Sequence, residues 1–409
     1  MNDISEKDKN QTHVISRRNF IKEVSATAAA GAIGIAEINC AGYRDKMKYV
    51  TLGRTGIKVS QFLGDRMSDR KMYEIAIASG VNYWHKIGHW VDPAPYDLFR
   101  KLDRDSFYCD TTVGSLDKEN AIEIFERCLK QTGLECIDGF KIHSQYRNAE
   151  DIKTKTGAIQ AFEHLKKQGK TRFLMMSQHI NISEVFEAAV ESEIFDVIQI
   201  PVNPTVPRDY FTKEVFLQKA DQDEYLAIIK KAADKGIAIT AMKVFLYGQK
   251  YWDEIPDLEE RVKDYLPDNK SIATALIHWA LNIPGVVAYG SMLYSFEELQ
   301  ENLEAIGGKL TELEDEGLKR FSTAIGGYVC RMCGACERAN PGGVAVSDIL
   351  RFSGYFIGHG QPALARSLYA ALPKSARMNA VKNLESYEKA CPYGIPVAKL
   401  LRKAQRLLT

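Results

Sequence analysis

The chain has 409 residues, of which 45% are hydrophobic and 26% are charged, and its formal net charge is +1 at pH 7. A chain of this length accommodates two domains, one of them large. Positive and negative charges are evenly balanced, so the composition provides no electrostatic basis for binding nucleic acid or a membrane surface. We therefore expect no nucleic-acid partner.

Residues 1–44 are expected to be an export signal and a linker. Arg17, Arg18 and Phe20 precede a modestly apolar stretch of small residues from 23 to 38. Paired arginines before a weak apolar segment are typical of a twin-arginine export signal. The stretch is too short for a typical membrane span, and we expect no such span beyond the signal. The predicted location is periplasmic or otherwise exported.

Residues 45–320 alternate between short apolar runs and amphipathic segments. Runs such as 197–200 and 237–242 are typical of strands that are buried on both faces. Eight strand-then-helix units predict the α/β class and a (β/α)8 TIM barrel. A hairpin with its turn at 54–56 is expected to close the barrel floor. The predicted strand ends are Gly64, Lys86, Thr112, His143, Ser177, Asn203, Lys243 and Ser291.

Residues 321–409 are predicted to form a small, mainly helical second domain that holds an iron–sulfur cluster. Cys330, Cys333 and Cys336 have the Cys-x-x-Cys-x-x-Cys spacing of a bacterial cluster loop, but Asn340 occupies the usual place of the fourth cysteine, before a proline. In two-cluster ferredoxins the fourth cysteine of each loop ligates the other cluster. Cys391, which also precedes a proline, is therefore expected to complete the set.

The second cluster of such a pair is predicted to be absent. Counting back from Cys391 in the same spacing gives the positions of the other loop's three ligands, which are occupied by Tyr387, Leu384 and Val381. The fourth ligand of that second cluster would stand at position 340, which is Asn340. One complete set of ligands is thus kept and the other is lost. We predict a single 4Fe–4S cluster; a structural zinc site, which four thiolates also suit, is the alternative.

The segments 52–60, 80–90, 137–144 and 290–303 resemble, in order and spacing, those of aldo/keto reductases. With the cysteine segment, the chain resembles such a reductase with a ferredoxin-like C-terminal extension. The resemblance implies a site at the C-terminal strand ends and, in active members, bound NADPH. In those members a tyrosine protonates the carbonyl oxygen, and a lysine held by an aspartate lowers the tyrosine's pKa.

Three of the four catalytic positions depart from that pattern. His85 stands in place of the aspartate, Trp90 in place of the tyrosine and Thr112 in place of the lysine, whereas His143 is kept. Tryptophan is not a usable acid and threonine carries no charge. Lys86 lies close by, so Lys86, His85 and His143 are candidates for a rearranged acid–base set.

The histidines also raise the alternative of a transition-metal site. His85, His89, His143 and Asp110 are predicted near the same strand ends, and imidazole and carboxylate groups are suitable ligands. The other interpretation is that these polar side chains hydrogen-bond to one another in a pocket that has lost its original use.

The nucleotide site implied by the resemblance is also altered. Gly290 and Glu298 stand where basic residues often hold the 2′-phosphate, and a negative side chain there opposes NADP. NADP(H) therefore stays an alternative cofactor. The candidate nucleotide-binding residues are Ser177, Gln178, Gln199, Ser291 and Asn302.

Three hypotheses follow, and they leave open whether the chain is an enzyme. The first is an exported iron–sulfur redox protein of aldo/keto reductase fold with a degenerate catalytic tetrad. Its cluster exchanges electrons with a redox partner protein or with a small-molecule ligand of the pocket. The second is an oxidoreductase with tightly bound NADP(H) and rearranged acid–base residues. The third is a non-catalytic binding subunit in which the cluster is structural.

Overall fold

The computed structural model describes residues 40–89, 95–178, 182–204, 222–245, 248–266, 271–330, 334–341, 343–378 and 383–409. The predicted twin-arginine motif, Trp90, Cys333 and Val381 lie outside these ranges. Within them, no helix combines the length and the apolar character that a bilayer crossing requires.

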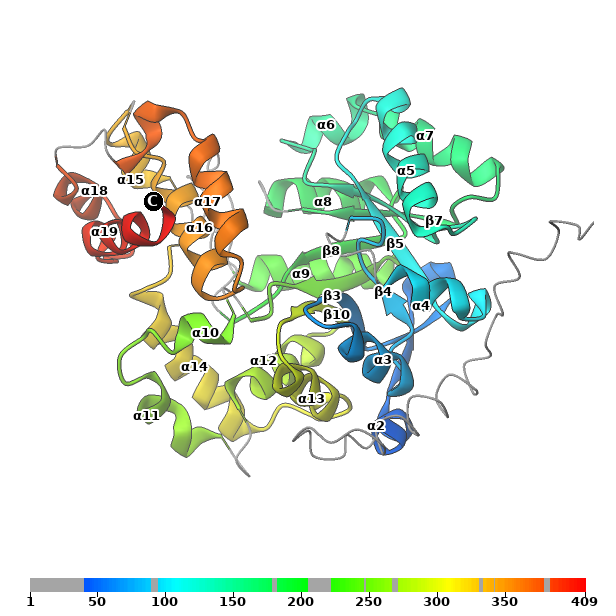
Figure 1. The fold of residues 1–409 in the computed structure, drawn as a ribbon, viewed down its shortest axis with the longest axis horizontal. Helices are drawn as coiled ribbons and strands as arrows, with labels where there is room; N and C mark the ends of the chain where they lie inside the picture. Colours follow the sequence, from blue (N-terminus) through cyan, green and yellow to red (C-terminus); the bar gives the residue numbers. More distant parts are fainter. Residues whose placement is uncertain are drawn as a thin grey trace, which may run out of the picture.

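Eight parallel strands close into a barrel in the order β10-β3-β4-β5-β6-β7-β8-β9 (Figure 1). Three of them, β7, β8 and β9, are buried along their whole length, as their apolar sequences predict. The predicted α/β class and eight-stranded barrel are confirmed. The strands are β3 (Phe62–Met67), β4 (Tyr83–Trp84), β5 (Tyr108–Val113), β6 (Gly139–His143), β7 (Phe173–Ser177), β8 (Val197–Pro201), β9 (Ala238–Met242) and β10 (Val286–Leu293).

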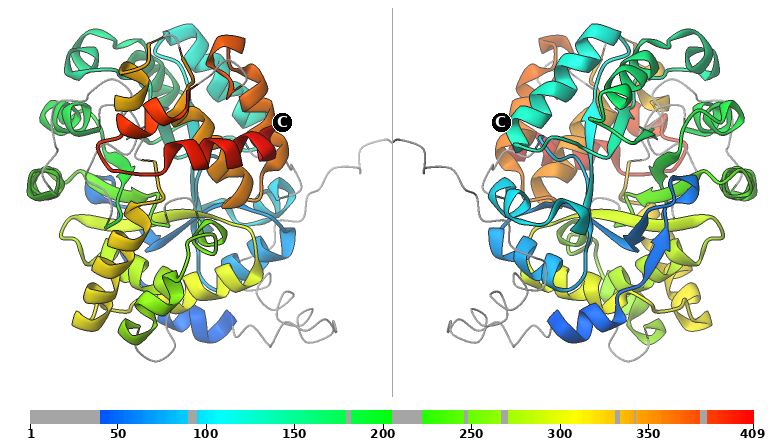
Figure 2. Two further views of the ribbon diagram at one scale, coloured as in Figure 1. Left: turned by 90° about the vertical axis from the view of Figure 1, so that its left-hand side faces the viewer. Right: turned by 90° about the vertical axis from the view of Figure 1, so that its right-hand side faces the viewer.

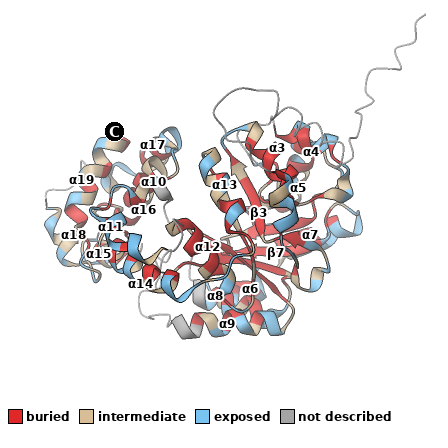
Figure 3. Ribbon diagram, turned by 90° about the horizontal axis from the view of Figure 1, so that it is seen from below, coloured by how far each residue is buried: buried red, intermediate tan, exposed pale blue. Residues whose placement is uncertain are grey.

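Helices surround the barrel, with buried faces toward the strands and exposed faces toward solvent (Figure 3). Helix α5 illustrates the local signals: Asp117 caps its N-terminus, and Gly133 ends it in the left-handed conformation. These helices are α3 (Arg70–Ala78), α4 (Tyr96–Lys101), α5 (Lys118–Thr132), α6 (Ala149–Thr154), α7 (Gly157–Lys167), α8 (Ile182–Ser192), α9 (Gln222–Asp234), α12 (Ile272–Asn282) and α13 (Phe296–Ala305). Helices α10 (Gln249–Trp252), α11 (Leu258–Val262) and α14 (Glu312–Gly326) lie on the side toward the C-terminal helices (Figure 1).

An antiparallel hairpin of β1 (Tyr49–Thr51) and β2 (Lys58–Ser60) closes the barrel at the N-terminal ends of its strands. Arg54, between these two strands, forms an ion pair with Asp196 at 2.8 Å just before β8. Apolar side chains fill the barrel floor above the hairpin, so this end of the barrel is closed. This floor cluster consists of Leu52, Val59, Leu63, Tyr83, Phe173, Met175, Val197, Ala238 and Ala288.

Residues 334–409, here called the C-terminal unit, are mainly helical and lie at the end of the barrel opposite the hairpin (Figure 2). Helix α16 packs against both α17 and α19. Helix α2 (Cys40–Lys46) packs beside α3. The helices of the C-terminal unit are α15 (Ala335–Arg338), α16 (Val346–Ile357), α17 (Pro362–Ala371), α18 (Glu385–Lys389) and α19 (Val397–Leu408).

The C-terminal unit is attached where the barrel strands have their C-terminal ends, a region here called the barrel mouth. Gln361 donates a hydrogen bond of 2.9 Å to the hydroxyl group of Tyr294, which directly follows β10. Lys403 of α19 forms an ion pair of 2.6 Å with Glu254, which follows α10. Active sites of (β/α)8 barrels lie at this end, so the C-terminal unit is adjacent to the expected site.

Candidate functional site

A buried ion pair crosses from β5 to β6 inside the barrel. Lys141 Nζ lies 2.6 Å from Asp110 Oδ1, and both side chains are fully buried. Burial opposes ionisation of Asp110, but Lys141 and His85 outweigh it, and the pKa of this carboxyl is lowered. Burial lowers the pKa of Lys141. A charged pair at this depth is held by direct contact and by further hydrogen bonds.

His85 completes this network together with Gln199 of β8. Its Nδ1 atom bonds to Asp110 Oδ2, and its Nε2 atom lies 3.1 Å from the amide nitrogen of Gln199. The amide nitrogen can only donate, so Nε2 of His85 accepts and Nδ1 carries the proton. Burial also lowers the pKa of His85, which favours this neutral form.

Lys141 is a residue that our sequence reasoning missed. In active aldo/keto reductases the aspartate and lysine come from the second and third strands, whereas here Asp110 and Lys141 come from the third and fourth strands of the barrel, β5 and β6. A signal was present: Lys141 stands two residues before His143, and alternate residues of a strand share a face. Thr112, at the family's lysine position, pairs with Lys141 in the strand register.

A second ion pair lies nearer the barrel mouth. Asp65 of β3 contacts Lys86 Nζ at 2.9 Å, and Lys86 follows β4 with a left-handed backbone (φ 55°). Burial opposes ionisation of Asp65, but the attraction of Lys86 prevails and the pKa of Asp65 is lowered. Burial likewise opposes the charge on Lys86, but Asp65 raises its pKa overall. Lys86 is therefore held as a cation at the barrel mouth.

The four residues considered for a metal site do not converge on one point. His85 and Asp110 are bonded to each other, His89 Nε2 faces Cys128 Sγ at 3.4 Å, and His143 Nδ1 contacts the Ser177 hydroxyl group at 2.6 Å. Among the described residues, no group of three or more His, Cys, Asp or Glu side chains is arranged around a position for one metal ion. The geometry favours hydrogen bonding among these side chains.

We predict that His143 makes stability depend on pH. Burial, followed by the charges of Lys141 and Lys86, lowers the pKa of His143 to about 3. The ordinary value in an unfolded chain is about 6.5, so as pH falls the unfolded state takes up the proton first. Stability should therefore decrease between pH 6.5 and 3, by at most about 1.4 kcal/mol per pH unit from this group.

Urea unfolding at several pH values tests this expectation with the variant His143→Gln. The amide retains a partner for Ser177 but cannot titrate, so the decrease in stability with falling pH should be smaller in the variant. His164→Gln, at an exposed position, should follow the wild type. Equal slopes for wild type and His143→Gln would contradict the prediction.

The candidate nucleotide-binding residues form hydrogen bonds within the protein. Asn302 accepts a hydrogen bond of 3.0 Å from the Tyr289 hydroxyl group and donates one of 2.7 Å to the Glu298 carbonyl. Gln199 contacts His85 and also accepts a bond of 3.4 Å from Lys141 Nζ, and Ser177 contacts His143. A bound dinucleotide would have to compete with these partners.

The remaining nucleotide candidates are engaged in the same way. Gln178 donates to the Tyr146 carbonyl at 2.9 Å, and Ser291 donates to the Met292 carbonyl at 3.1 Å. The Glu298 carboxylate accepts a bond of 2.6 Å from the Tyr294 backbone N–H. Burial raises the pKa of Glu298. The chain thus presents a half-buried acidic group where the 2′-phosphate would lie, which is a poor fit for NADP(H).

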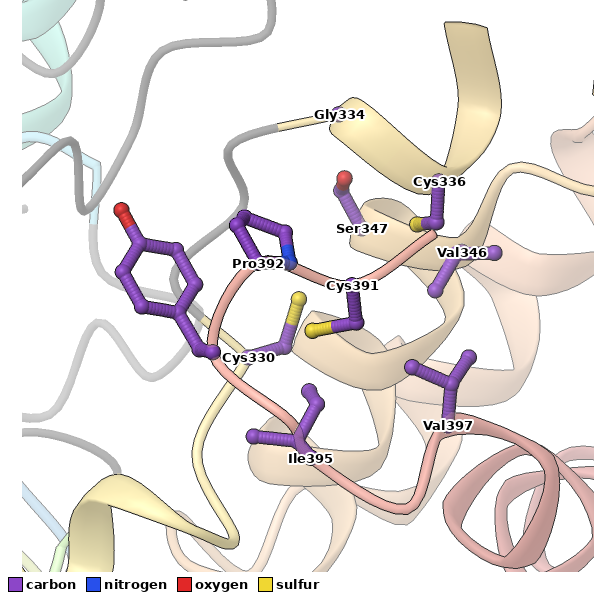
Figure 4. Close-up of a pocket in the computed structure, with 10 residues that line it drawn as sticks. Cys330, Gly334, Cys336, Val346, Ser347, Cys391, Pro392, Ile395 and Val397 are labelled. Carbon is purple, nitrogen blue, oxygen red and sulfur yellow. The ribbon is translucent and has the colours of Figure 1, made fainter. Parts of the chain in front are cut away.

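Three of the four predicted cluster ligands line one pocket, which is formed by Cys330 and residues of the C-terminal unit (Figure 4). Cys330, Cys336 and Cys391 border about 290 Å³ of atom-free space, part of it open to solvent. The described cysteines form no disulfide. Cysteine thiolates are the donors that a 4Fe–4S cluster requires, each bound to a different iron, so these residues are the ones that would hold it. No three described side chains surround one position suited to a single metal ion, as a structural zinc would need. Other residues around the pocket are Gly334, Val346, Ser347, Pro392, Tyr393, Ile395 and Val397.

The described residues at the predicted second-cluster positions contact neighbouring parts of the chain. Tyr387 is buried, and its hydroxyl group accepts a bond of 2.9 Å from the Val344 backbone N–H. The amide of Asn340 donates to the Cys336 carbonyl at 2.9 Å and accepts from Ser386 at 2.7 Å. Among the described residues, the positions predicted to have lost their thiols are therefore packed against neighbouring chain.

The barrel is similar to those of solved aldo-keto reductase structures. No family model and no curated protein matches the chain. The holo form of the aldo-keto reductase AKR11C1 from Bacillus halodurans is similar over 67% of this chain and 96% of its own, with a TM-score of 0.53 and 16% identity. The barrel has the aldo-keto reductase fold. The apo form of the same protein gives a TM-score of 0.50 at 17% identity. At 16–17% sequence identity, this structural similarity shows a shared fold and nothing further.

Proposed function

We propose that the chain is an exported iron–sulfur redox protein of aldo-keto reductase fold. Its single 4Fe–4S cluster exchanges electrons with a partner protein or with a small molecule at the barrel mouth, without the hydride transfer of the family. The observation that carries the proposal is that Cys391 lines the same pocket as Cys330 and Cys336, as the shared-ligand pattern predicts.

Helix α16 connects the cysteine pocket with the barrel mouth. Val346 and Ser347, at its beginning, line the pocket. The ring of Tyr355, near its end, lies 5.8 Å from that of His359, which lies 5.9 Å from the ring of Tyr294 directly after β10. The distance along the helix axis from Val346 to Tyr355 is about 14 Å. A bound cluster would supply a one-electron redox centre at the first of these two places.

The barrel also approaches the cysteine pocket directly through α10. The Tyr251 hydroxyl group donates to the Tyr328 carbonyl at 3.2 Å, two residues before Cys330. Burial and, to a smaller extent, the Cys330 thiol raise the pKa of Tyr251. These contacts support a single redox unit in which the pocket and the barrel are coupled.

Hydride transfer by the family's mechanism has little support in this pocket. Thr112 carries no charge at the lysine position, and the observed aspartate–lysine pair, Asp110 with Lys141, lies on the third and fourth strands and not on the second and third. The candidate nucleotide contacts are satisfied within the protein. These observations disfavour the alternative with tightly bound NADP(H).

The proposal is tested by purifying the full chain anaerobically and assaying iron, sulfide and retained nucleotide. About four irons and four sulfides per chain, no nucleotide, and a reversible one-electron reduction are expected. Retained nicotinamide nucleotide would favour the second hypothesis. A cluster that cannot be reduced reversibly would favour the third, in which the cluster is structural.

We also predict that the purified protein shows no NADPH-dependent reduction of generic aldehydes above background. General acid catalysis contributes on the order of a hundredfold or more to the rate. Because Trp90 and Thr112 replace the family's tyrosine and lysine, the rate of aldehyde reduction should fall to the background level. NADPH oxidation followed by absorbance provides the measurement. Robust turnover that His143→Ala abolishes, while removal of the cluster does not, would contradict this prediction.

A further inference from the structure

The balanced net charge of the chain conceals an uneven distribution of charge along the sequence. Residues 361–409 contain nine lysine and arginine residues but two glutamates, a net charge of +7, whereas the whole chain carries +1. Residues 1–360 therefore carry −6. Charge asymmetry between parts of a chain indicates an interaction through the charged part. The positive part is the segment that contributes Cys391 to the cysteine pocket.

Much of the excess positive charge lies on one side of helix α19. The four basic residues of this helix are spaced i, i+3, i+4 and i+7, which places them on a single side. The opposite side is buried and includes Leu401 and Leu408. Helix α19 runs across the outer surface of the C-terminal unit (red in Figure 2, left). The basic face, as we call these four residues, consists of Lys399, Arg402, Lys403 and Arg406.

Acidic side chains neutralise only half of the basic face. Arg402 forms an ion pair of 2.7 Å with Glu385, and Lys403 forms one of 2.6 Å with Glu254. The other two members are exposed and form no ion pair with any described residue. The second glutamate of the positive segment, Glu388, instead accepts a bond of 3.0 Å from a backbone N–H at the start of α19. The basic face thus presents uncompensated charge to solvent.

This arrangement differs from that of other exposed helices in the chain. Like charges three or four positions apart repel each other and weaken a helix, whereas opposite charges at these spacings support it. Helix α14 has the supporting arrangement: Lys319 pairs with Asp315 at 2.9 Å, and Arg320 pairs with Glu316 at 3.5 Å. A helix side that only faces water is typically patterned in this way. The repulsion within the basic face would be relieved by negative charges from outside the chain.

The basic face begins beside the cysteine pocket. Val397, the first residue of α19, lines the pocket, and the basic face extends about 14 Å from it along the helix axis. Lys389 is exposed and precedes Cys391 by two residues, and Pro392 of the pocket lining is also exposed. A protein bound to the basic face would therefore lie close to the predicted cluster ligands, as electron exchange over a short distance requires.

We propose that the basic face binds an acidic redox protein, which is the electron-exchange partner of the cluster. One electron leaves the reduced cluster and reduces the partner, or passes in the reverse direction, with no bond made or broken. This exchange rests on the proposed function, whereas binding requires only complementary charge. An anionic membrane is a poorer fit, because the apolar side of α19 is buried and packs against α16, so it is not available to lipid.

The probe is an acidic flavodoxin, immobilised for surface plasmon resonance and exposed to the anaerobically prepared full chain at two ionic strengths. Flavodoxin should bind, and the affinity should decrease as salt is added. At the lower ionic strength, Lys399→Gln/Arg406→Gln should weaken binding roughly three- to thirtyfold, since two exposed charges are removed from the contact. Lys130→Gln/Lys167→Gln removes the same charge from exposed positions on α5 and α7 and should weaken binding far less.

The outcomes separate the docking surface from the redox proposal. Flavodoxin binding that depends on the basic face, in a preparation whose cluster is not reversibly reduced, supports the surface while overturning the proposed function. Absence of flavodoxin binding at the lower ionic strength overturns the surface, even where the cluster is reversibly reduced. Equal weakening by the two double variants also overturns it. Phosphatidylserine vesicles that bind more tightly than flavodoxin, and lose binding in Lys399→Gln/Arg406→Gln, would assign the basic face to a membrane and overturn the proposal.

Discussion

Replacing Cys391 by alanine is expected to damage the cluster about as severely as replacing Cys333, although the two lie far apart in the sequence. Cys391 shares its pocket with Cys330 and Cys336, and a 4Fe–4S cluster with four cysteine ligands depends on every thiolate. Formation of a metal site and folding of a small domain are coupled. The variant should therefore lose most of its iron, and residues from about 325 to 409 should become less ordered while the barrel stays folded.

Iron content, low-temperature electron paramagnetic resonance of the reduced protein and hydrogen exchange of the C-terminal unit provide the measurements. Cys136→Ala is a matched control because Cys136 is a partly exposed cysteine that does not line the pocket. Asn340→Cys should not create a second cluster, since Tyr387 is packed into that region. Full iron and an unchanged spectrum in Cys391→Ala would show that the fourth ligand is another group.

Replacing Lys141 by methionine is expected to destabilise the barrel by about 3–5 kcal/mol, the usual cost of removing one partner of a buried ion pair. The Asp110 carboxylate would stay buried, with the His85 imidazole and the Tyr83 hydroxyl group as its remaining side-chain donors. Urea unfolding monitored through the barrel at pH 7 measures the loss.

Two further variants determine whether the isolated charge is the cause. Lys230→Met breaks an exposed pair with Asp234 and should change stability by about 0.5 kcal/mol or less. The double variant Asp110→Asn/Lys141→Met leaves no buried charge and should be less destabilised than the sum of its single variants. Additive losses would indicate that packing of the Lys141 stem, not its charge, matters at this position.

Much of the barrel was predictable because the strands are buried on both faces and the helices on one. The predicted end of the fourth strand, His143, is the observed end of β6, and Ser177 ends β7 as predicted. The predicted ends at Gly64 and Asn203 differ from the observed strands by a few residues. Strand boundaries depend on pairing between neighbouring strands, which a local pattern reports only approximately.

The candidate site was harder to predict for a physical reason. The spacing of three cysteines with a distant Cys-Pro pair is a local pattern, and Cys391 does line the pocket with Cys330 and Cys336. The pairing of Lys141 with Asp110 depends on the register of two strands. The contact of Gln361 with Tyr294 depends on how the C-terminal unit packs on the barrel, and a local sequence pattern does not report such packing.

The hairpin at the barrel floor and the C-terminal unit at the mouth lie at opposite ends of the molecule (Figure 2). Their placement at opposite ends has a consequence for immobilising the protein on an electrode. A tether at the exposed Lys58 of the hairpin would hold the molecule with its cysteine pocket away from the conductor. A tether at the exposed Arg402 of α19 would bring the pocket toward it. Reversing the attachment point should therefore change the rate of interfacial electron exchange without altering any predicted ligand of the cluster.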